Sequence, residues 1–227
     1  MPTRALSATL QLASPALPIG AFSYSSGFES AIDLGWVKDA PGAQAWIASQ
    51  CNEALLRWEI PLWKQLYAAW YEAPAHIAGL NLKAIAARES AELRSEYTQM
   101  GHALVKWCVD VIPDEIPAAQ IELLQKLSPV SVLTAHALAS RAMQVSEEAG
   151  ALAYAFSFVE NQVMAATKAI PLGQTSAQRM LRALTRNLAP EVAHALALHE
   201  PQWSSAAPLA AIASMKHETQ YTRLFRS

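Results

Sequence analysis

Residues 93–108 of the chain, LRSEYTQMGHALVKWC, contain the pattern that decides the fold class. Large apolar residues recur in this stretch at steps of three or four, namely Leu93, Tyr97, Met100, Leu104 and Cys108. This spacing places them on one face of an α-helix. We expect the helical pattern to run without a break from residue 77 to residue 111.

Gly101 lies in the middle of this pattern, although glycine is unfavourable in a helix by about 1 kcal/mol relative to alanine. Without a β-carbon, however, the helix backbone can approach a neighbouring segment very closely. The sequence therefore predicts close contact with another helix at Gly101.

The composition outside this stretch also favours helices. Alanine, which loses no side-chain entropy on folding, occupies 45 of the 227 positions. The chain has only 8 glycines and 13 prolines, which disfavours collagen-like, disordered and β-sandwich chains. The sequence predicts an all-α, single-domain helical bundle of about ten helices over residues 1–227, with a flexible hinge at residues 200–208 and a partner-binding tail at residues 216–227.

Charge and cysteine content exclude several classes of protein. The 17 basic and 19 acidic residues give a net charge of −2, whereas a nucleic-acid-binding domain is usually strongly basic. The longest apolar run in the body of the chain, residues 151–159, is too short to span a bilayer. Cys51 and Cys108 are too far apart in sequence for a CxxC motif and suggest structural thiols. We expect a cytoplasmic protein that binds neither nucleic acid nor membrane.

No recognised catalytic or metal-binding motif occurs in the sequence. The six histidines form no pair with metal-ligand spacing, and neither a Walker A sequence nor a GxSxG motif is present. We therefore expect no catalytic residues, no metal site, no cofactor and no enzymatic activity.

A loop at residues 14–27 is the first of three segments that suggest binding to other proteins. Two prolines, two glycines and four serines interrupt any long helix there. A free linker would not carry four large apolar residues within eight positions, so we expect them to be at least partly buried (Leu17, Ile19, Phe22 and Tyr24).

The second segment, residues 171–179, joins two helices. Lys168 lies in the last turn before it, and Arg179, Arg182 and Arg186 follow at helical spacing to form a basic stripe. A stripe of this kind is either an ordinary solvated helix face or a site that attracts an acidic partner.

The third segment is the tail, residues 216–227. Tyr221, Leu224 and Phe225 are large side chains with little chain left to cover them. The tail is either a frayed end or a segment that becomes ordered on a partner. Because three buried side chains could not offset the entropy of ordering twelve residues, we expect it to depend on a partner and to contribute little to the stability of the free protein.

Four stretches carry a resemblance to a known family, and they occur in the family's order along essentially the whole chain. They are residues 14–29 (SPALPIGAFSYSSGFE), residues 88–101 (RESAELRSEYTQMG), residues 172–179 (LGQTSAQR) and residues 217–227 (HETQYTRLFRS). Together they resemble the urease accessory protein UreF family.

The resemblance implies an all-helical, cytoplasmic, dimer-forming protein without catalytic activity. Family members act with UreD (also called UreH) and the GTPase UreG on apo-urease, and the assembly inserts nickel in a GTP-dependent step. UreF bridges UreD and UreG, and its family is proposed to regulate GTP hydrolysis.

The resemblance also selects candidate contact residues. For UreG they are Lys168, Gly173, Gln174, Gln178 and Arg179. For UreD they are the tail residues His217, Tyr221, Arg223, Leu224, Phe225 and Arg226.

Two other functions remain open from the sequence. One is a metallochaperone that itself binds and passes nickel, for which a dimer axis would have to bring histidines of two chains together. The other is a GTPase-activating protein that supplies a cation to the transition state, with Lys168, Arg179 and Arg223 as candidates.

Overall fold

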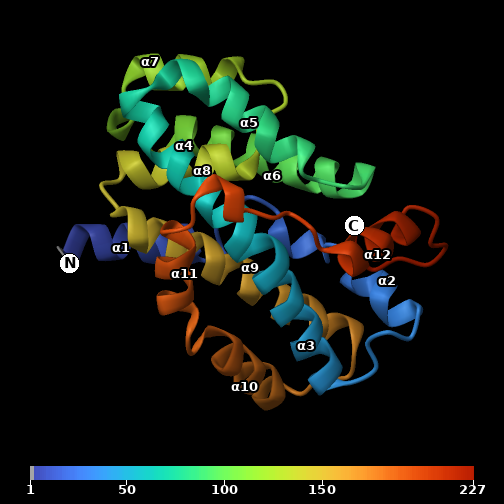
Figure 1. Ribbon diagram of the computed structural model, residues 1–227. Coiled ribbons are helices and arrows are strands. Elements are labelled where there is room, and N and C mark those ends of the chain that lie inside the picture. Colours follow the sequence, from blue (N-terminus) through green and yellow to red (C-terminus); the bar gives the residue numbers. More distant parts are fainter. Residues whose placement is uncertain (1–2) are drawn as a thin grey trace.

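Twelve α-helices form most of the protein in a computed structural model that describes residues 3–227 (Figure 1). Their bounds are α1 Thr3–Ala13, α2 Phe28–Asp33, α3 Ala40–Gln50, α4 Ile60–Glu72, α5 Ile77–Ala86, α6 Ala91–Val111, α7 Ala118–Lys126, α8 Val132–Ala142, α9 Glu147–Ala169, α10 Gln174–Thr185, α11 Leu188–Leu196 and α12 Pro208–His217. A π-helical stretch, η2 (Cys51–Glu59), connects α3 and α4, and a short 3-10 helix, η5 (Glu200–Gln202), precedes α12. Residues 3–227 contain no strand, which confirms the all-α helical bundle. Residues 1 and 2 of the predicted domain lie outside the described residues.

Side-chain caps set several helix starts. Asp39 accepts a hydrogen bond from the Gly42 amide at 2.9 Å and begins α3. Ser90 accepts one from Leu93 at 3.0 Å and begins α6. The unbroken helix expected over residues 77–111 is therefore wrong, because α5 ends at Ala86 and Ser90 starts a new helix.

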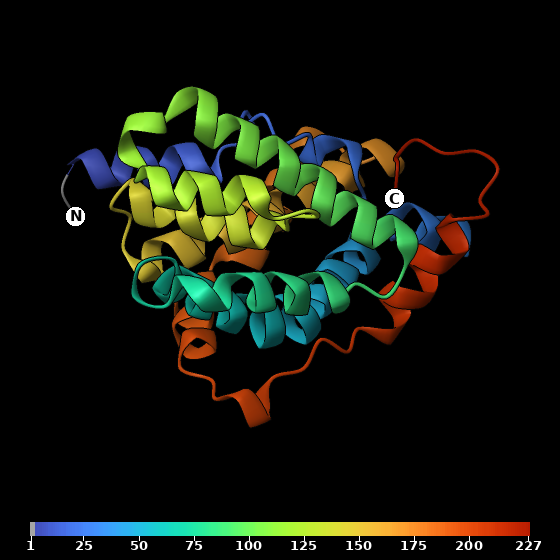
Figure 2. The same cartoon turned by 90° about the horizontal axis from the view of Figure 1, so that it is seen from above.

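The core is centred on α8, which packs against α4, α5, α6 and α9 (Figures 1 and 2). Every residue of α8 except Arg141 is buried. The indole N–H of Trp63 donates to Nδ1 of His136 at 3.1 Å, and that of Trp70 donates to the Thr134 carbonyl at 3.0 Å. Burial lowers the pKa of His136 to about 3, so its imidazole is neutral at physiological pH and accepts the Trp63 hydrogen.

Gly101 marks the closest approach between α6 and the segment that enters α8. A β-carbon at Gly101 would overlap the carbonyl oxygen of Val130 and lie 2.8 Å from the carbonyl carbon of Ser131. The close contact predicted from the sequence is confirmed, although its partner is the segment just before α8.

The C-terminal part of the chain returns to the N-terminal part. Helix α12 packs on α2 and α6, and the tail beyond it curves back to end near them (Figure 2). Gly27 permits this packing, because a β-carbon there would lie only 2.9 Å from the Ser214 amide nitrogen. Within residues 3–227, no helix has the length and apolar character needed to cross a lipid bilayer.

Candidate partner-binding surface

Glu29, in the first turn of α2, holds the tail against the body of the protein. Its Oε1 accepts the Leu224 amide at 2.7 Å, and its Oε2 accepts the Phe225 amide at 3.0 Å. The carboxylate is largely buried, so these charge-assisted bonds are shielded from competing water. One acidic side chain thus fixes the backbone of the tail about 195 residues further along the chain.

A second acidic residue, Glu92 on α6, extends this anchor. The ring of His217 is fully buried, with Nδ1 at 2.6 Å from Glu92 and Nε2 at 3.3 Å from Glu29. Each ring nitrogen thus lies within hydrogen-bonding distance of a carboxylate, and the two contacts fix the orientation of the ring. Arg223 completes the group, with Nη1 at 2.7 Å from the other oxygen of Glu92.

Glu96, one turn further along α6, ties the end of the tail to the loop at residues 14–27. Its two oxygens accept hydrogen bonds from the hydroxyls of Ser26 and Ser227. The carbonyl of Ser227 in turn accepts from the amide and hydroxyl of Ser25. Burial raises the pKa of Glu96, and the two serine hydroxyls partly offset this effect.

Lys168 connects the same loop and tail from the end of α9. Its ammonium donates to the Phe22 carbonyl at 3.2 Å and lies 5.7 Å from the Phe22 ring centre and 5.6 Å from that of Phe225. Both distances suit cation–π attraction. The first and third segments singled out in the sequence therefore form one surface with Lys168 between them. We call it the loop–tail face and define it as the exposed residues Phe22, Lys168, Tyr221, Arg223, Leu224 and Arg226.

Burial within the loop differs from the expectation at one position. Leu17 and Tyr24 are buried and Ile19 is half-buried, as expected. The expectation for Phe22 is wrong, because its side chain is 64% exposed. The ring lies on the loop–tail face, and the stabilising burial expected of Phe22 is absent.

Part of the tail is buried against the body of the protein. Phe225 is 5% exposed, so the chain itself covers this side chain, whereas Tyr221 and Leu224 are exposed. His217 and Phe225, two of the candidate UreD contacts, thus support the face from beneath, while Tyr221, Arg223, Leu224 and Arg226 lie on it. Because Glu29 and Glu96 of the same chain hold the tail, we expect it to contribute to the stability of the free protein, and not to be nearly neutral as the sequence predicts.

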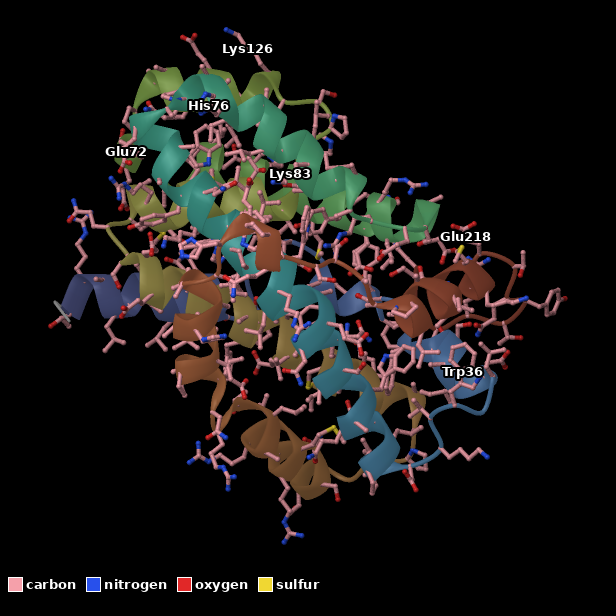
Figure 3. The ribbon with its side chains drawn as sticks, viewed as in Figure 1. Trp36, Glu72, His76, Lys83, Lys126 and Glu218 are labelled. Carbon is pink, nitrogen blue, oxygen red and sulfur yellow. The ribbon has the colours of Figure 1, made fainter. Side chains whose placement is uncertain are left out.

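Helix α12 adds an apolar stripe that the sequence analysis did not single out. Leu209, Ile212 and Met215 follow one another at steps of three and are exposed, whereas Ala211 and Ser214 face the body. Trp36 is also exposed, and Figure 3 shows it at the same end of the molecule as Glu218, which follows α12 directly. The signal in the sequence was the spacing of large apolar residues on a helix close to the end of the chain.

The second segment forms the start of α10, which packs on α9 and α3. Gly173, Gln174, Gln178 and Arg179 are exposed, while Ala177 and Met180 are buried beneath them. The side chains of Arg182 and Arg186 are exposed as well. The structure therefore places Lys168 with the loop and tail, and the other four candidate UreG contacts on a separate helix (Figure 1).

The N-terminal half of the predicted hinge at residues 200–208 contacts the body of the protein. Lys83 pairs with Glu200 at 2.8 Å, and its ammonium lies 4.8 Å from the ring centre of Trp203. The Ser204 amide donates to the Arg57 carbonyl at 3.2 Å. The flexibility of this segment stays a prediction.

Cys51 and Cys108 are buried free thiols, and burial raises the pKa of each to about 12, so neither is a thiolate at physiological pH. Within residues 3–227, no three histidine, cysteine or acidic side chains form a group that could hold a metal ion.

The fold and this surface define an all-helical protein whose buried carboxylates hold an exposed apolar and cationic face, an arrangement typical of proteins that act by association. The family model of UreF matches residues 37–185. The chain is 43% identical over 233 residues to a urease accessory protein UreF of Polynucleobacter asymbioticus, covering 98% of this chain and 97% of that protein.

Two further relatives carry the same name. The protein of Dechloromonas aromatica is 42% identical over 223 residues, covering 98% of this chain and 97% of its own length. That of Azoarcus sp. is 43% identical over 220 residues, covering 96% and 94%. The chain belongs to the UreF family of urease accessory proteins.

Proposed function

We propose that this chain is a non-catalytic scaffold in urease maturation, which bridges UreD and the GTPase UreG on apo-urease during GTP-dependent insertion of nickel. Nickel is the cargo of this assembly. The proposal includes a cytoplasmic location, a homodimer of this chain within the complex and an influence on GTP hydrolysis by UreG. The observation that carries it is the loop–tail face, on which a network of buried carboxylates holds a tail that presents large side chains to solvent.

The loop–tail face is the proposed site for UreD. Tyr221 and Leu224 are large side chains that are exposed to solvent, and tyrosine is among the residues that most often contribute strongly to binding when a partner covers them. The exposed stripe of α12 lies directly before the tail in the chain and adds apolar area to the same proposed site. Since Glu29 and Glu96 already order the tail, UreD would meet a preorganised surface, which reduces the entropy lost on binding.

The start of α10 is the proposed site for UreG. Gly173 and Gln174 begin the helix, and Arg179 on it makes no ion pair within residues 3–227. An exposed arginine without an internal partner is available to an acidic surface. Lys168 contributes from the neighbouring loop–tail face, so the two sites adjoin at the end of α9.

Truncating two exposed side chains tests the UreD site. We expect the double variant Tyr221→Ala/Leu224→Ala to weaken UreD binding at least about tenfold, because both side chains would be buried against the partner. The melting temperature should stay near that of the unaltered chain, since neither side chain packs on the body. Binding is measured by titration with purified UreD and by reconstituted urease activation.

Leu82→Ala is the matched control for this test. Leu82 on α5 is 60% exposed, close to the 68% of Leu224, but lies far from the tail in the sequence. It should leave UreD binding unchanged. A double variant that binds UreD as tightly as the unaltered chain would exclude the loop–tail face as the site.

Charge reversal tests the UreG site. We expect Lys168→Glu and Arg179→Glu each to weaken recruitment of UreG by the preformed complex with UreD, with a loss that shrinks as salt rises. Lys126→Glu is the control, since Lys126 is an exposed cation on α7, at the end of the molecule opposite α10 (Figure 3). Recruitment that is equal in all three variants would contradict this assignment.

Equilibrium dialysis with Ni²⁺ separates the scaffold from the alternative metallochaperone. The scaffold predicts that the isolated chain retains no nickel. Stoichiometric retention would instead favour the metallochaperone.

A further inference from the structure

A groove lies between α3 and α10, which pack side by side, and it has a volume of about 570 Å³ (Figure 1). Its walls are mostly small side chains, with alanines on both helices (Ala40, Ala45, Ala48 and Ala183). Among residues 3–227, no aromatic side chain lines it. Small side chains on both walls allow another segment to approach the two helices closely.

The walls indicate which kind of segment fits the groove. Both walls are α-helices, whose backbone groups are largely hydrogen-bonded within each helix, so an extended segment would find few backbone partners there. An α-helix satisfies its own backbone and can place an apolar face against apolar walls. The groove is therefore suited to an amphipathic helix.

Three exposed arginines of α10 determine the charge at the groove. Arg179 lines it, Arg182 lies one turn further along, and Arg186 follows at the end of the helix, two turns from Arg179 and on the same side. None of the three makes an ion pair within residues 3–227. Lys38 and Asp39, just before α3, cancel in formal charge. Because like charges at this spacing repel each other along a helix, an acidic segment would stabilise the arrangement.

A second groove, between α4 and α5, is similar in size and walls but differs in charge. Its volume is about 600 Å³, and its lining includes the small residues Ala68, Ala75 and Gly79. Glu72 and His76 also line it, whereas no lysine or arginine of residues 3–227 does. Figure 3 shows Glu72 and His76 at the end of the molecule away from α10. The second groove is thus a natural control for the first.

We propose that the groove between α3 and α10 receives an amphipathic helix of UreG, with its apolar face against the alanines and its acidic side chains against Arg179 and Arg186. The unpaired arginines favour an acidic occupant, and the helical walls favour a helical one. The inference rests on the proposed function for the presence of UreG. It deepens that function by adding α3 to the site and by naming the kind of segment that docks there.

Filling the groove tests whether it is occupied. We expect Ala45→Trp to weaken recruitment of UreG by the preformed complex with UreD at least about tenfold, because the indole takes the space of the docked helix. Ala75→Trp is the matched control, since Ala75 is an exposed alanine of the second groove, as Ala45 is of the first. The control should leave recruitment unchanged, and both variants should keep the melting temperature of the unaltered chain. Equal recruitment of UreG by the two variants would overturn the proposal.

Crosslinking identifies the occupant. Gln44 is an exposed residue of the groove, and Cys51 and Cys108 are buried, so a photoreactive thiol label on Gln44→Cys reports on the groove alone. In the complex with UreD and UreG, we expect crosslinks to one helical segment of UreG that carries acidic residues. Crosslinks only to UreD, or only to a second copy of this chain, would overturn the proposal.

An exchange of charges tests the acidic contact without filling the groove. Arg186→Glu should weaken recruitment of UreG about tenfold, and the loss should shrink as salt rises. A lysine in place of an acidic residue in the crosslinked segment of UreG should restore recruitment by Arg186→Glu but not by Ala45→Trp. If no such exchange restores recruitment, the arginines do not bind an acidic helix and the proposal fails.

The same measurements separate this inference from the proposed function. If the unaltered complex recruits UreG and the groove variants recruit it equally well, the inference fails while the proposed function stands. If the unaltered complex does not recruit UreG, the proposed function fails and the inference fails with it.

Discussion

Replacement of Gly101 by alanine will destabilise the protein by about 3 kcal/mol. The added β-carbon would overlap the Val130 carbonyl oxygen, which is part of the backbone and not the mobile end of a side chain. That backbone cannot easily retreat, because Asn81 holds it on both sides of Val130. The side chain of Asn81 donates from Nδ2 to the Pro129 carbonyl at 2.9 Å. Its Oδ1 accepts a hydrogen bond from the backbone N–H of Ser131 at 2.9 Å. The change in the free energy of unfolding is measured by urea denaturation.

Gly79→Ala is the matched control, since Gly79 also lies inside a helix, α5. A β-carbon there would have no atom within 4 Å, so only helix propensity changes. We expect this variant to be more stable than the unaltered chain by about 1 kcal/mol. Two alanine variants of similar stability would contradict the close packing of α6 against residues 130–131.

Replacement of Glu29 by alanine will have a comparable effect, and it will act on both stability and binding. It leaves the Phe225 amide buried without an acceptor and removes one partner of His217. We expect a loss of about 3 kcal/mol in the free energy of unfolding, since each unpaired buried group costs about 1–3 kcal/mol. UreD binding should fall with it, because Tyr221 and Leu224 lose their fixed position.

Glu122→Ala on α7 is the control for Glu29. Its carboxylate is exposed and, among residues 3–227, pairs only with Lys126 at 3.8 Å, so its removal should change the stability by less than about 0.5 kcal/mol. Equal stability of the two alanine variants would contradict the anchoring of the tail through Glu29.

Local patterns predicted the helical part of the fold well. The spacing of Leu93, Leu104 and Cys108 indicated α6, and the absence of a side chain at Gly101 indicated a close approach. Both features could be predicted from the sequence, because each depends on neighbouring residues in the chain or on the geometry of a single residue. The break before Ser90 was missed, because the apolar spacing continues across it and only the Ser90 cap marks the start of a new helix.

The candidate surface was less predictable because long-range pairing creates it. The tail looked unsupported in the sequence, as no local pattern shows that Glu29 meets Leu224 and Phe225. Phe22 was expected to be at least partly buried because it is large and apolar, but its side chain is exposed.

Helix α12 is a second case in which the sequence does not reveal which residues are exposed. Its large residues, such as Ile212 and Met215, would normally mark the buried face of a helix. Here the small residues Ala211 and Ser214 face the body, because the approach to Gly27 leaves no room for larger ones. Hydrophobicity alone would therefore place the wrong face of α12 against the body. The close approach of the helix to Gly27 determines which face is buried.

Amide hydrogen exchange, followed by NMR on the full chain alone and with UreD, tests the central claim most directly. In the free protein we expect the Leu224 and Phe225 amides to exchange slowly, because Glu29 accepts both hydrogens. Addition of UreD should then slow exchange further at residues 19–24 and 220–227 and leave residues 118–126 unchanged. A tail that exchanges like an unfolded peptide in the free protein, or a UreD footprint that omits both segments, would contradict the account.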